Sequence, residues 1–222
     1  MRELIRVNSL EEALGKKGAY LAGGTEILRL DSPLDKAISV IDILPFLSKE
    51  VEDEGDWIRI GAGCTFSSLL SSALIPSFLK EALSYMSSPE LREMATIGGN
   101  IASFRDDSFL IPTLASASAR LEVLLPGGKE CIPLSSFKRD GGIILSITVS
   151  KTADVKNFRE SLTSHSHAVV TAAFSSECEC YAVKGSGIFF DHDSLSFASD
   201  MYGSAEYKRY LSELYRSESG RS

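Results

Sequence analysis

Two short glycine-rich stretches contain the residues that could bind a phosphorylated ligand. The first is Leu21-Ala22-Gly23-Gly24-Thr25-Glu26-Ile27, and the second is Ala95-Thr96-Ile97-Gly98-Gly99-Asn100-Ile101. A Gly-Gly pair allows positive φ and lets a ligand approach the backbone without a Cβ in the way. Several N–H groups can then point into one concavity, which binds an anion. Two such turns predict one ligand with a diphosphate, although a single Gly-Gly pair also marks ordinary turns.

The chain offers few other groups for catalysis. It contains no G-x-x-x-x-G-K-[ST] motif for phosphoryl transfer and no G-x-S-x-G nucleophile elbow. His165 and His167 could bind a metal from one face of a strand, but no further ligand follows at a familiar spacing, so we expect no metal site. The adjacent Asp106 and Asp107 point to opposite faces of an extended chain; one could accept from a ligand hydroxyl, or both could be solvated. This pattern favours a protein whose bound cofactor performs the reaction.

Composition narrows the class of protein. With 222 residues, 44% of them hydrophobic, the chain has enough apolar side chains for a core and for one to three small domains. A net charge of −7 argues against nonspecific nucleic-acid binding. No apolar run approaches the ~20 residues of a membrane span. Residues 1–7 lack the apolar centre of a signal peptide, so we expect a cytoplasmic protein.

The cysteines predict neither a zinc site nor an iron–sulfur cluster. Their spacing includes no C-x-x-C pair, and we expect buried, reduced thiols at Cys64, Cys131, Cys178 and Cys180.

Hydrophobic patterns predict an α/β start and a strand-rich end. The first residues alternate as strand 3–7, helix 10–16, strand 19–21, helix 27–30 and strand 37–43. The first glycine turn therefore follows a strand, where ligands of α/β sheets bind. Further helices are expected after Thr65 and over 76–86, 89–94 and 109–118. Residues 51–61 are predicted to form a hairpin with its turn at Glu54-Gly55-Asp56, and Pro126-Gly127-Gly128 is the predicted turn of a second hairpin between strands 120–125 and 129–133. Further strands are expected over 143–149, 157–162, 168–174 and 178–183. The closing helix from Ser204 is predicted to have an apolar face of Tyr207, Tyr210, Leu211, Leu214 and Tyr215.

The two glycine stretches together resemble a known family. Ala22 to Leu28 and Ala95 to Ala102, in this order and at this interval, are similar to the two signatures of the FAD-binding medium subunit of molybdenum hydroxylases, the xanthine dehydrogenase and carbon monoxide dehydrogenase family. The flanking Ile60 to Thr65 and the strand Ile144 to Ile147 resemble it too. The resemblance covers nearly the whole chain and is weakest after about residue 150.

This resemblance implies an α+β fold of the PCMH type. Two N-terminal α/β subdomains would sandwich FAD, with residues 1–52 as the first and 53–150 as the second. Residues 151–222 would form a small C-terminal α+β domain with an antiparallel sheet.

The resemblance also implies the FAD-binding residues. They are Leu21, Ala22, Gly23, Gly24, Thr25, Glu26 and Ile27 from the first subdomain, and Ala95, Thr96, Gly98, Gly99 and Asn100 from the second. Asp107 stands near the family position that faces the adenosine half, and Leu145 near the position beside a flavin or adenine ring. The aspartate that many members carry falls at Phe109 here. No catalytic residue and no metal ligand are expected.

The implied function is electron transfer through FAD. The partners would be a [2Fe–2S] small subunit and a molybdopterin-binding large subunit, with NAD⁺ or another molecule as the acceptor. Two alternatives stay open: a non-catalytic assembly scaffold that keeps the fold, and a free-standing flavoenzyme with its own small substrate.

Overall fold

The computed structural model describes residues 3–28, 39–86, 88–139, 142–163 and 166–221. The chain forms two compact units. The first unit consists of Met1–Leu74, Pro89–Ser103 and Arg120–Thr148, and the second of Ile75–Ser88, Phe104–Ala119 and Val149–Ser222. The division of the chain at residues 52 and 150, drawn from the resemblance, stays a prediction.

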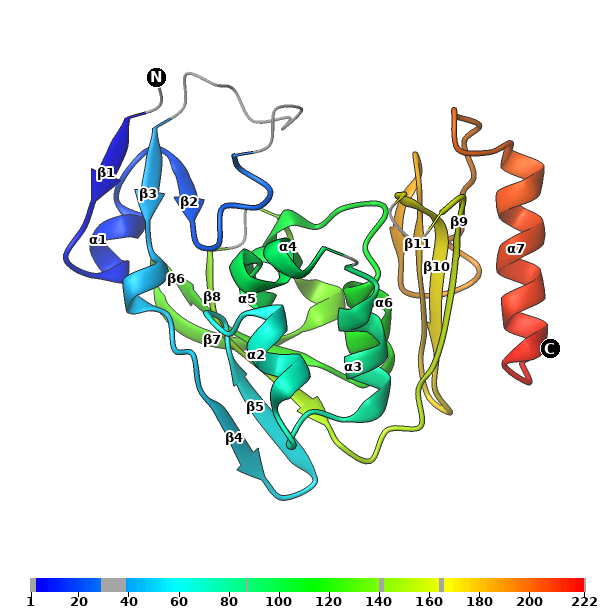
Figure 1. Ribbon diagram of the computed structural model, residues 1–222, viewed down its shortest axis with the longest axis horizontal. Helices are drawn as coiled ribbons and strands as arrows, with labels where there is room; N and C mark the ends of the chain where they lie inside the picture. Colours follow the sequence, from blue (N-terminus) through cyan, green and yellow to red (C-terminus); the bar gives the residue numbers. More distant parts are fainter. Residues whose placement is uncertain (1–2, 29–38, 87, 140–141, 164–165, 222) are drawn as a thin grey trace. The chain divides into compact units, whose positions relative to one another are not determined.

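A small parallel sheet begins the first unit (Figure 1). Its strands lie in the order β1 (Leu4–Arg6), β3 (Val40–Asp42) and β2 (Ala19–Leu21). Both outer strands run parallel to β3, as the predicted β-α-β pattern requires. Helix α1 (Leu10–Leu14) starts where the Ser9 hydroxyl accepts from the Glu12 N–H.

One predicted helix in this region is wrong within the described residues. Thr25 to Leu28 form a turn, closed by the Leu28 N–H donating to the Gly24 carbonyl at 3.0 Å. The rest of that prediction, at 29 and 30, and the start of the predicted strand, at 37 and 38, lie outside the described residues.

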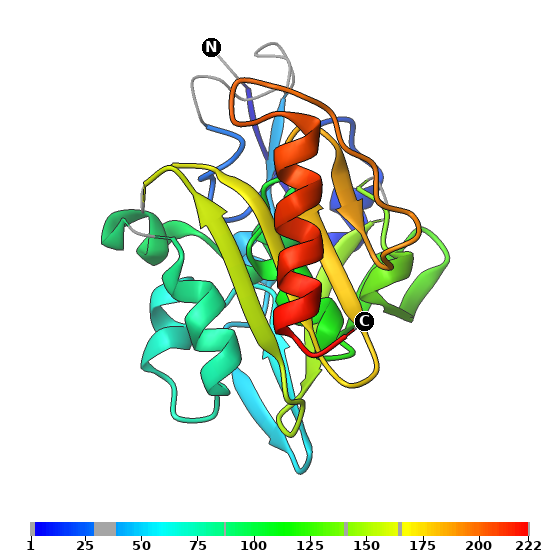
Figure 2. The ribbon, with the colours of Figure 1, turned by 90° about the vertical axis from the view of Figure 1, so that its right-hand side faces the viewer.

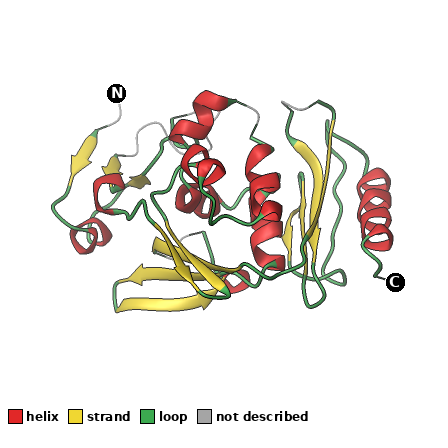
Figure 3. Cartoon of the chain, turned by 60° about the horizontal axis from the view of Figure 1, so that its bottom comes forward, coloured by secondary structure: helices red, strands yellow, loops and turns green. Residues whose placement is uncertain are grey.

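A five-stranded sheet forms the rest of the first unit (Figure 3). Its order is β4 (Val51–Glu54), β5 (Trp57–Gly61), β8 (Ile143–Ser150), β6 (Arg120–Leu125) and β7 (Gly128–Pro133). The same unit contains the α-helices α2 (Phe66–Ser71), α4 (Pro89–Met94) and α5 (Ile97–Ser103) and the 3₁₀ helices η1 (Leu44–Phe46) and η2 (Leu134–Ser136). The hairpin predicted at Pro126-Gly127-Gly128 is confirmed, because β6 and β7 pair antiparallel across it.

The second unit is an antiparallel sheet with helices (Figure 2). Its strands lie in the order β12 (Gly187–Phe189), β11 (Glu179–Val183), β10 (Ala168–Phe174) and β9 (Lys156–Ser161). Its helices are α3 (Ser77–Ser84), α6 (Leu110–Ser116) and α7 (Ala205–Glu218). Every residue of β10 is buried, since this strand lies inside the sheet and helices α6 and α7 both contact it. This confirms the predicted α+β C-terminal region with an antiparallel sheet.

The predicted apolar face of the closing helix is partly wrong. Leu211 and Tyr215 are buried against the sheet, as expected. Tyr207 and Tyr210 are exposed, and Lys208 is buried in their place. The buried side of α7 therefore carries Lys208, Leu211 and Tyr215, and the two exposed tyrosines lie outside it. A lysine can occupy such a buried position when its ammonium group forms hydrogen bonds.

The four cysteines are free, and their burial differs from the expectation at one position. Cys64 and Cys180 are buried and Cys178 is half-buried, but Cys131 is exposed on β7, at the edge of its sheet. Among the described residues, no helix has the length and apolar content needed to cross a membrane.

Candidate functional site

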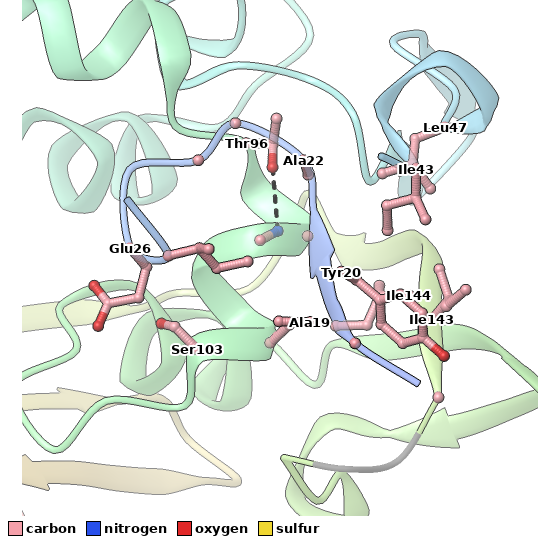
Figure 4. A pocket seen from close by; sticks show the side chains of 18 of the residues that line it. Ala19, Tyr20, Ala22, Glu26, Ile43, Leu47, Thr96, Ser103, Ile143 and Ile144 are labelled. Carbon is pink, nitrogen blue, oxygen red and sulfur yellow. Dashed lines mark hydrogen bonds between the residues drawn. The ribbon is translucent and has the colours of Figure 1, made fainter. Parts of the chain in front are cut away.

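The two glycine stretches line one cavity within the first unit (Figure 4). Its volume is about 890 Å³, within the range usual for small-molecule sites. Nine of the predicted FAD-binding residues line it: Ala22, Gly23, Gly24, Thr25, Glu26, Ile27, Thr96, Gly98 and Gly99. Leu21, Ala95, Asn100, Asp107 and Leu145 are not among its lining residues.

The first glycine stretch is a loop at the carboxyl end of β2. Gly24 has φ +77°, a backbone conformation that favours glycine. Within the described residues, the N–H groups of Gly23, Gly24 and Thr25 donate no hydrogen bond to the protein. Backbone N–H groups in such a turn form an anion nest. This loop is therefore the part of the cavity best suited to hold a phosphate.

The second glycine stretch is a helix, which corrects the prediction of a second turn. Ile97 to Ser103 form α5, and its first N–H groups already have acceptors. Ile97 and Gly98 donate to the carbonyls of Cys64 and Ala62, each at 3.0 Å, and Gly99 donates to the Thr96 hydroxyl at 3.2 Å (dashed line in Figure 4). The expected symmetry of two anion nests is therefore absent from the described structure.

The glycines of the second stretch serve close packing. A Cβ on Gly98 would lie 2.6 Å from the Ala62 Cβ, so only glycine lets α5 begin against this loop. Gly23 is constrained in the same way, because a Cβ there would overlap the Met94 carbonyl at the end of α4. The paired motifs thus bring the first loop and the start of α5 together, and the cavity forms beside them.

The opposite wall of the cavity is apolar. Tyr20 from β2 and Ile143 and Ile144 from β8 face it in Figure 4, and a flat ring could pack there. Burial raises the pKa of Tyr20, which keeps its phenol neutral. Leu145 was predicted to lie beside a flavin or adenine ring. The two residues before it, Ile143 and Ile144, line the cavity instead.

The cationic side chains of the lining are Lys17 and Arg139, both exposed. Among the described residues that line the cavity, the acidic one is Glu26. Because neither cation belongs to a recognisable motif, the sequence did not predict either of them as a binding residue.

Asp107 belongs to the second unit and is held there by three basic side chains. The Arg105 guanidinium donates to both carboxylate oxygens, at 2.7 and 2.9 Å. Lys184 Nζ lies 3.4 Å and His167 Nδ1 2.5 Å from Asp107 Oδ2. Burial alone would raise the pKa of Asp107, but Arg105, with Lys184 and His167, outweighs it and lowers the pKa to about 2. The predicted contact between Asp107 and an adenosine stays a prediction.

The histidine pair does not form a described metal site. His165 lies outside the described residues, and His167 contacts Asp107. No group of three or more metal-ligating side chains occurs in the described part of the chain.

The cavity residues fit the phosphate and ring chemistry of FAD. Three N–H groups of one loop have no acceptor in the described structure, and at Gly23 and Gly24 no side chain blocks their approach. The apolar wall offers a surface for a ring. A dinucleotide needs both features, anion-binding N–H groups and a site for a flat ring.

Comparisons with known proteins agree with this fit. Residues 2–149 match the family described as the FAD binding domain in molybdopterin dehydrogenase. The chain is 32% identical over 131 residues to the uncharacterized protein YgfM of Escherichia coli (strain K12), covering 54% of this chain and 49% of that protein. It is 31% identical over 134 residues to the nicotinate dehydrogenase FAD-subunit of Eubacterium barkeri, covering 54% and 45%. The chain thus matches about half the length of these curated relatives.

Solved structures show the same fold. A chain of the carbon monoxide dehydrogenase from Hydrogenophaga pseudoflava superposes with a TM-score of 0.81 at 19% identity, covering 96% of this chain and 93% of that chain. A chain of the reconstituted CO dehydrogenase from Oligotropha carboxidovorans gives 0.82 at 18% identity, covering 98% and 96%. Because the family model spans most of the chain and the cavity fits its ligand, this protein belongs to the family of FAD-binding domains of molybdopterin dehydrogenases.

Proposed function

We propose that this chain is the FAD-binding electron-transfer subunit of a molybdenum-containing dehydrogenase complex. The observation that supports it most is the cavity of the first unit, where the loop N–H groups of Gly23, Gly24 and Thr25 have no protein acceptor in the described structure. FAD supplies the redox chemistry when bound. The chain's own residues bind it and hold it in place.

The proposed binding residues divide by role. Gly23, Gly24 and Thr25 donate to the diphosphate through their N–H groups. Thr96 and Gly99 stabilise the start of α5 against this loop. The remaining predicted contacts, to Leu21, Ala22, Glu26, Ile27, Ala95, Gly98, Asn100, Asp107 and Leu145, are part of the same proposal.

The proposed partners are a [2Fe–2S] subunit and a molybdopterin-binding subunit. Relatives of this chain carry the names of FAD subunits and medium chains of dehydrogenases, which implies further chains. Electrons would arrive from the iron–sulfur clusters and leave to NAD⁺ or another acceptor. The four free cysteines agree with a reducing compartment, and we place the complex in the cytoplasm.

The test is the cofactor content of the purified full chain. We expect a flavin absorption spectrum with one FAD per chain, or uptake of added FAD to that ratio. Gly24→Val should abolish this uptake, because its side chain disfavours the φ of +77° and would contact Leu28. A well-folded wild-type chain that stays colourless after incubation with FAD would overturn the proposal.

The same variant separates electron transfer from a scaffold. If the chain transfers electrons, the complex with Gly24→Val should assemble and lose its dehydrogenase activity. Retained activity in a flavin-free complex would show that the chain acts as an assembly scaffold.

A further inference from the structure

The cavity of the first unit has a positively charged lining in a protein that is acidic overall. The chain carries a net charge of −7. Among the described residues that line the cavity, Lys17 and Arg139 are cationic and Glu26 is acidic, so this lining carries a net positive charge. A charged cleft with low-dielectric walls concentrates ligands of the opposite charge. The cavity therefore attracts anions that the acidic surface elsewhere repels.

The two cations come from separate segments of the first unit. Lys17 lies between α1 and β2, and Arg139 precedes β8. Neither forms an ion pair with a described carboxylate. In Figure 4, Ala19 and Ile143, which follow the two cations in the chain, lie away from Glu26. The charges of Lys17 and Arg139 therefore remain available to a ligand in the cavity.

A diphosphate in this cavity needs more than the N–H groups of the glycine loop. Backbone N–H groups supply only partial positive charges, and Glu26 in the same loop is negative. An anion that leaves water requires compensating charge as well as hydrogen bonds. Lys17 and Arg139 are the described lining residues that supply full positive charges.

We propose that Lys17 and Arg139 make this cavity selective for anionic flavins through their charge. The inference rests on the proposed function, because it concerns the cavity that would hold FAD. The loop N–H groups fix the position of the diphosphate, and the two cations draw the ligand in and stabilise it once bound. Charges that line a cavity are screened by salt less than charges on the open surface, so their effect is specific to the cavity.

The experiment measures the binding of FAD, ADP and riboflavin to the flavin-free full chain at low and at high ionic strength. In Lys17→Met/Arg139→Met, FAD and ADP should associate about tenfold more slowly at low salt and bind more weakly. Their affinities should also depend less on salt than in the wild type. Riboflavin, which has no phosphate, should bind the variant and the wild type equally.

Two further variants separate charge from other effects. Lys17→Arg/Arg139→Lys keeps both charges and should keep the wild-type affinity, because charge and not hydrogen-bond geometry is proposed to act. Lys16→Met/Lys138→Met is the matched control. It removes the same net charge from neighbouring residues that are exposed and do not line the cavity, and it should bind all three ligands like the wild type.

The possible outcomes distinguish this inference from the proposed function. Unchanged binding of FAD and ADP in Lys17→Met/Arg139→Met would overturn the inference. So would an equal loss in the control variant, an equal loss of riboflavin affinity, or a loss in the charge-conserving variant. A wild type that binds ADP with the expected salt dependence but takes up no FAD would contradict the proposed function alone, and one that binds neither would contradict both.

Discussion

At the scale of single residues, Gly23 and Gly24 have different tasks within one motif. Gly24 requires a positive φ, whereas Gly23 requires the absence of a Cβ beside Met94. A sequence motif cannot separate these reasons, because both positions read as glycine. Substitutions can separate these two reasons. Alanine at position 24 disfavours the positive φ, whereas alanine at position 23 adds a Cβ that overlaps the Met94 carbonyl.

Gly24→Ala and Gly55→Ala form a matched pair for this purpose. Both glycines have φ +77°, but a Cβ on Gly55 meets nothing within 4 Å. Each variant should lose about 1–2 kcal/mol of unfolding free energy from backbone strain. Only Gly24→Ala should also weaken FAD binding, by about tenfold or more, because its loop N–H groups move. Titration of the apo chain with FAD measures this, and equal losses of affinity in both variants would contradict a local role for Gly24.

The lowered pKa of Asp107 predicts a loss of stability in acid. Its folded pKa of about 2 lies below the ordinary aspartate value of 3.8, so ionised Asp107 stabilises the fold above about pH 4. This contribution, about 2 kcal/mol, is lost as pH falls from 4 through 2.

Asp107→Asn should therefore be less stable at neutral pH and show a smaller decline of stability below pH 4. Urea unfolding at several pH values measures this. The exposed Asp154→Asn of the same unit is the control and should follow the wild type. A decline of the same size in Asp107→Asn would show that other groups cause the acid sensitivity.

At the scale of elements, helix α7 is attached to its unit by a buried lysine. Lys208 Nζ donates to the carbonyls of Lys184 and Ala198, at 2.6 and 2.8 Å, and lies 2.8 Å from Asp200 Oδ2. These three contacts satisfy the whole ammonium group. They also attach the segment before α7 to the end of β11, next to Gly185, where a Cβ would lie 2.5 Å from the Asp200 carboxylate.

Lys208→Met should lower the unfolding free energy by about 3 kcal/mol, because it leaves Asp200 without its partner and two carbonyls without a donor. Adding Asp200→Asn should recover part of the loss, since no unpaired charge then remains. Lys156→Met is the control: this exposed lysine makes one hydrogen bond, to Ser219, and its loss should change little. Equal effects of the two lysine variants would mean that burial of Lys208 contributes no stability.

At the scale of the whole molecule, ligand binding and stability are linked. FAD that binds only the folded chain should stabilise it by about 2.7 kcal/mol at a concentration 100 times its Kd. We expect Tm to rise with FAD concentration, and to rise less with riboflavin, which lacks the phosphates that the glycine loop would hold. Differential scanning fluorimetry or calorimetry measures both. An equal rise with riboflavin would exclude the loop as the main source of affinity.

Local patterns were enough to predict many elements. The alternating and continuous apolar runs predicted β10 at its observed bounds and the β6–β7 hairpin around Pro126-Gly127-Gly128. Ser204 was predicted to start the closing helix, and its hydroxyl accepts from the Tyr207 N–H. These features depend on neighbours in sequence, so sequence alone contains their physical cause.

Other features depend on contacts between distant segments. The Ile97–Ser103 helix follows from hydrogen bonds to Ala62 and Cys64, which the glycine pair itself does not reveal. Arg159 and Thr171 are cross-strand neighbours only because β9 and β10 pair in this register. Lys208 is buried because distant carbonyls accept from it.

The sequence by itself determined the family, the α+β class and one glycine loop placed after a strand, because motif spacing and hydrophobic period are local properties. Only the tertiary structure decided that the N–H groups of Gly23, Gly24 and Thr25 have no acceptor in the described part of the chain, whereas those of Ile97, Gly98 and Gly99 have one, since acceptors come from other parts of the chain. The same structure placed Asp107 among three basic side chains and Arg159 beside Thr171, because charge partners are chosen in space and not along the sequence.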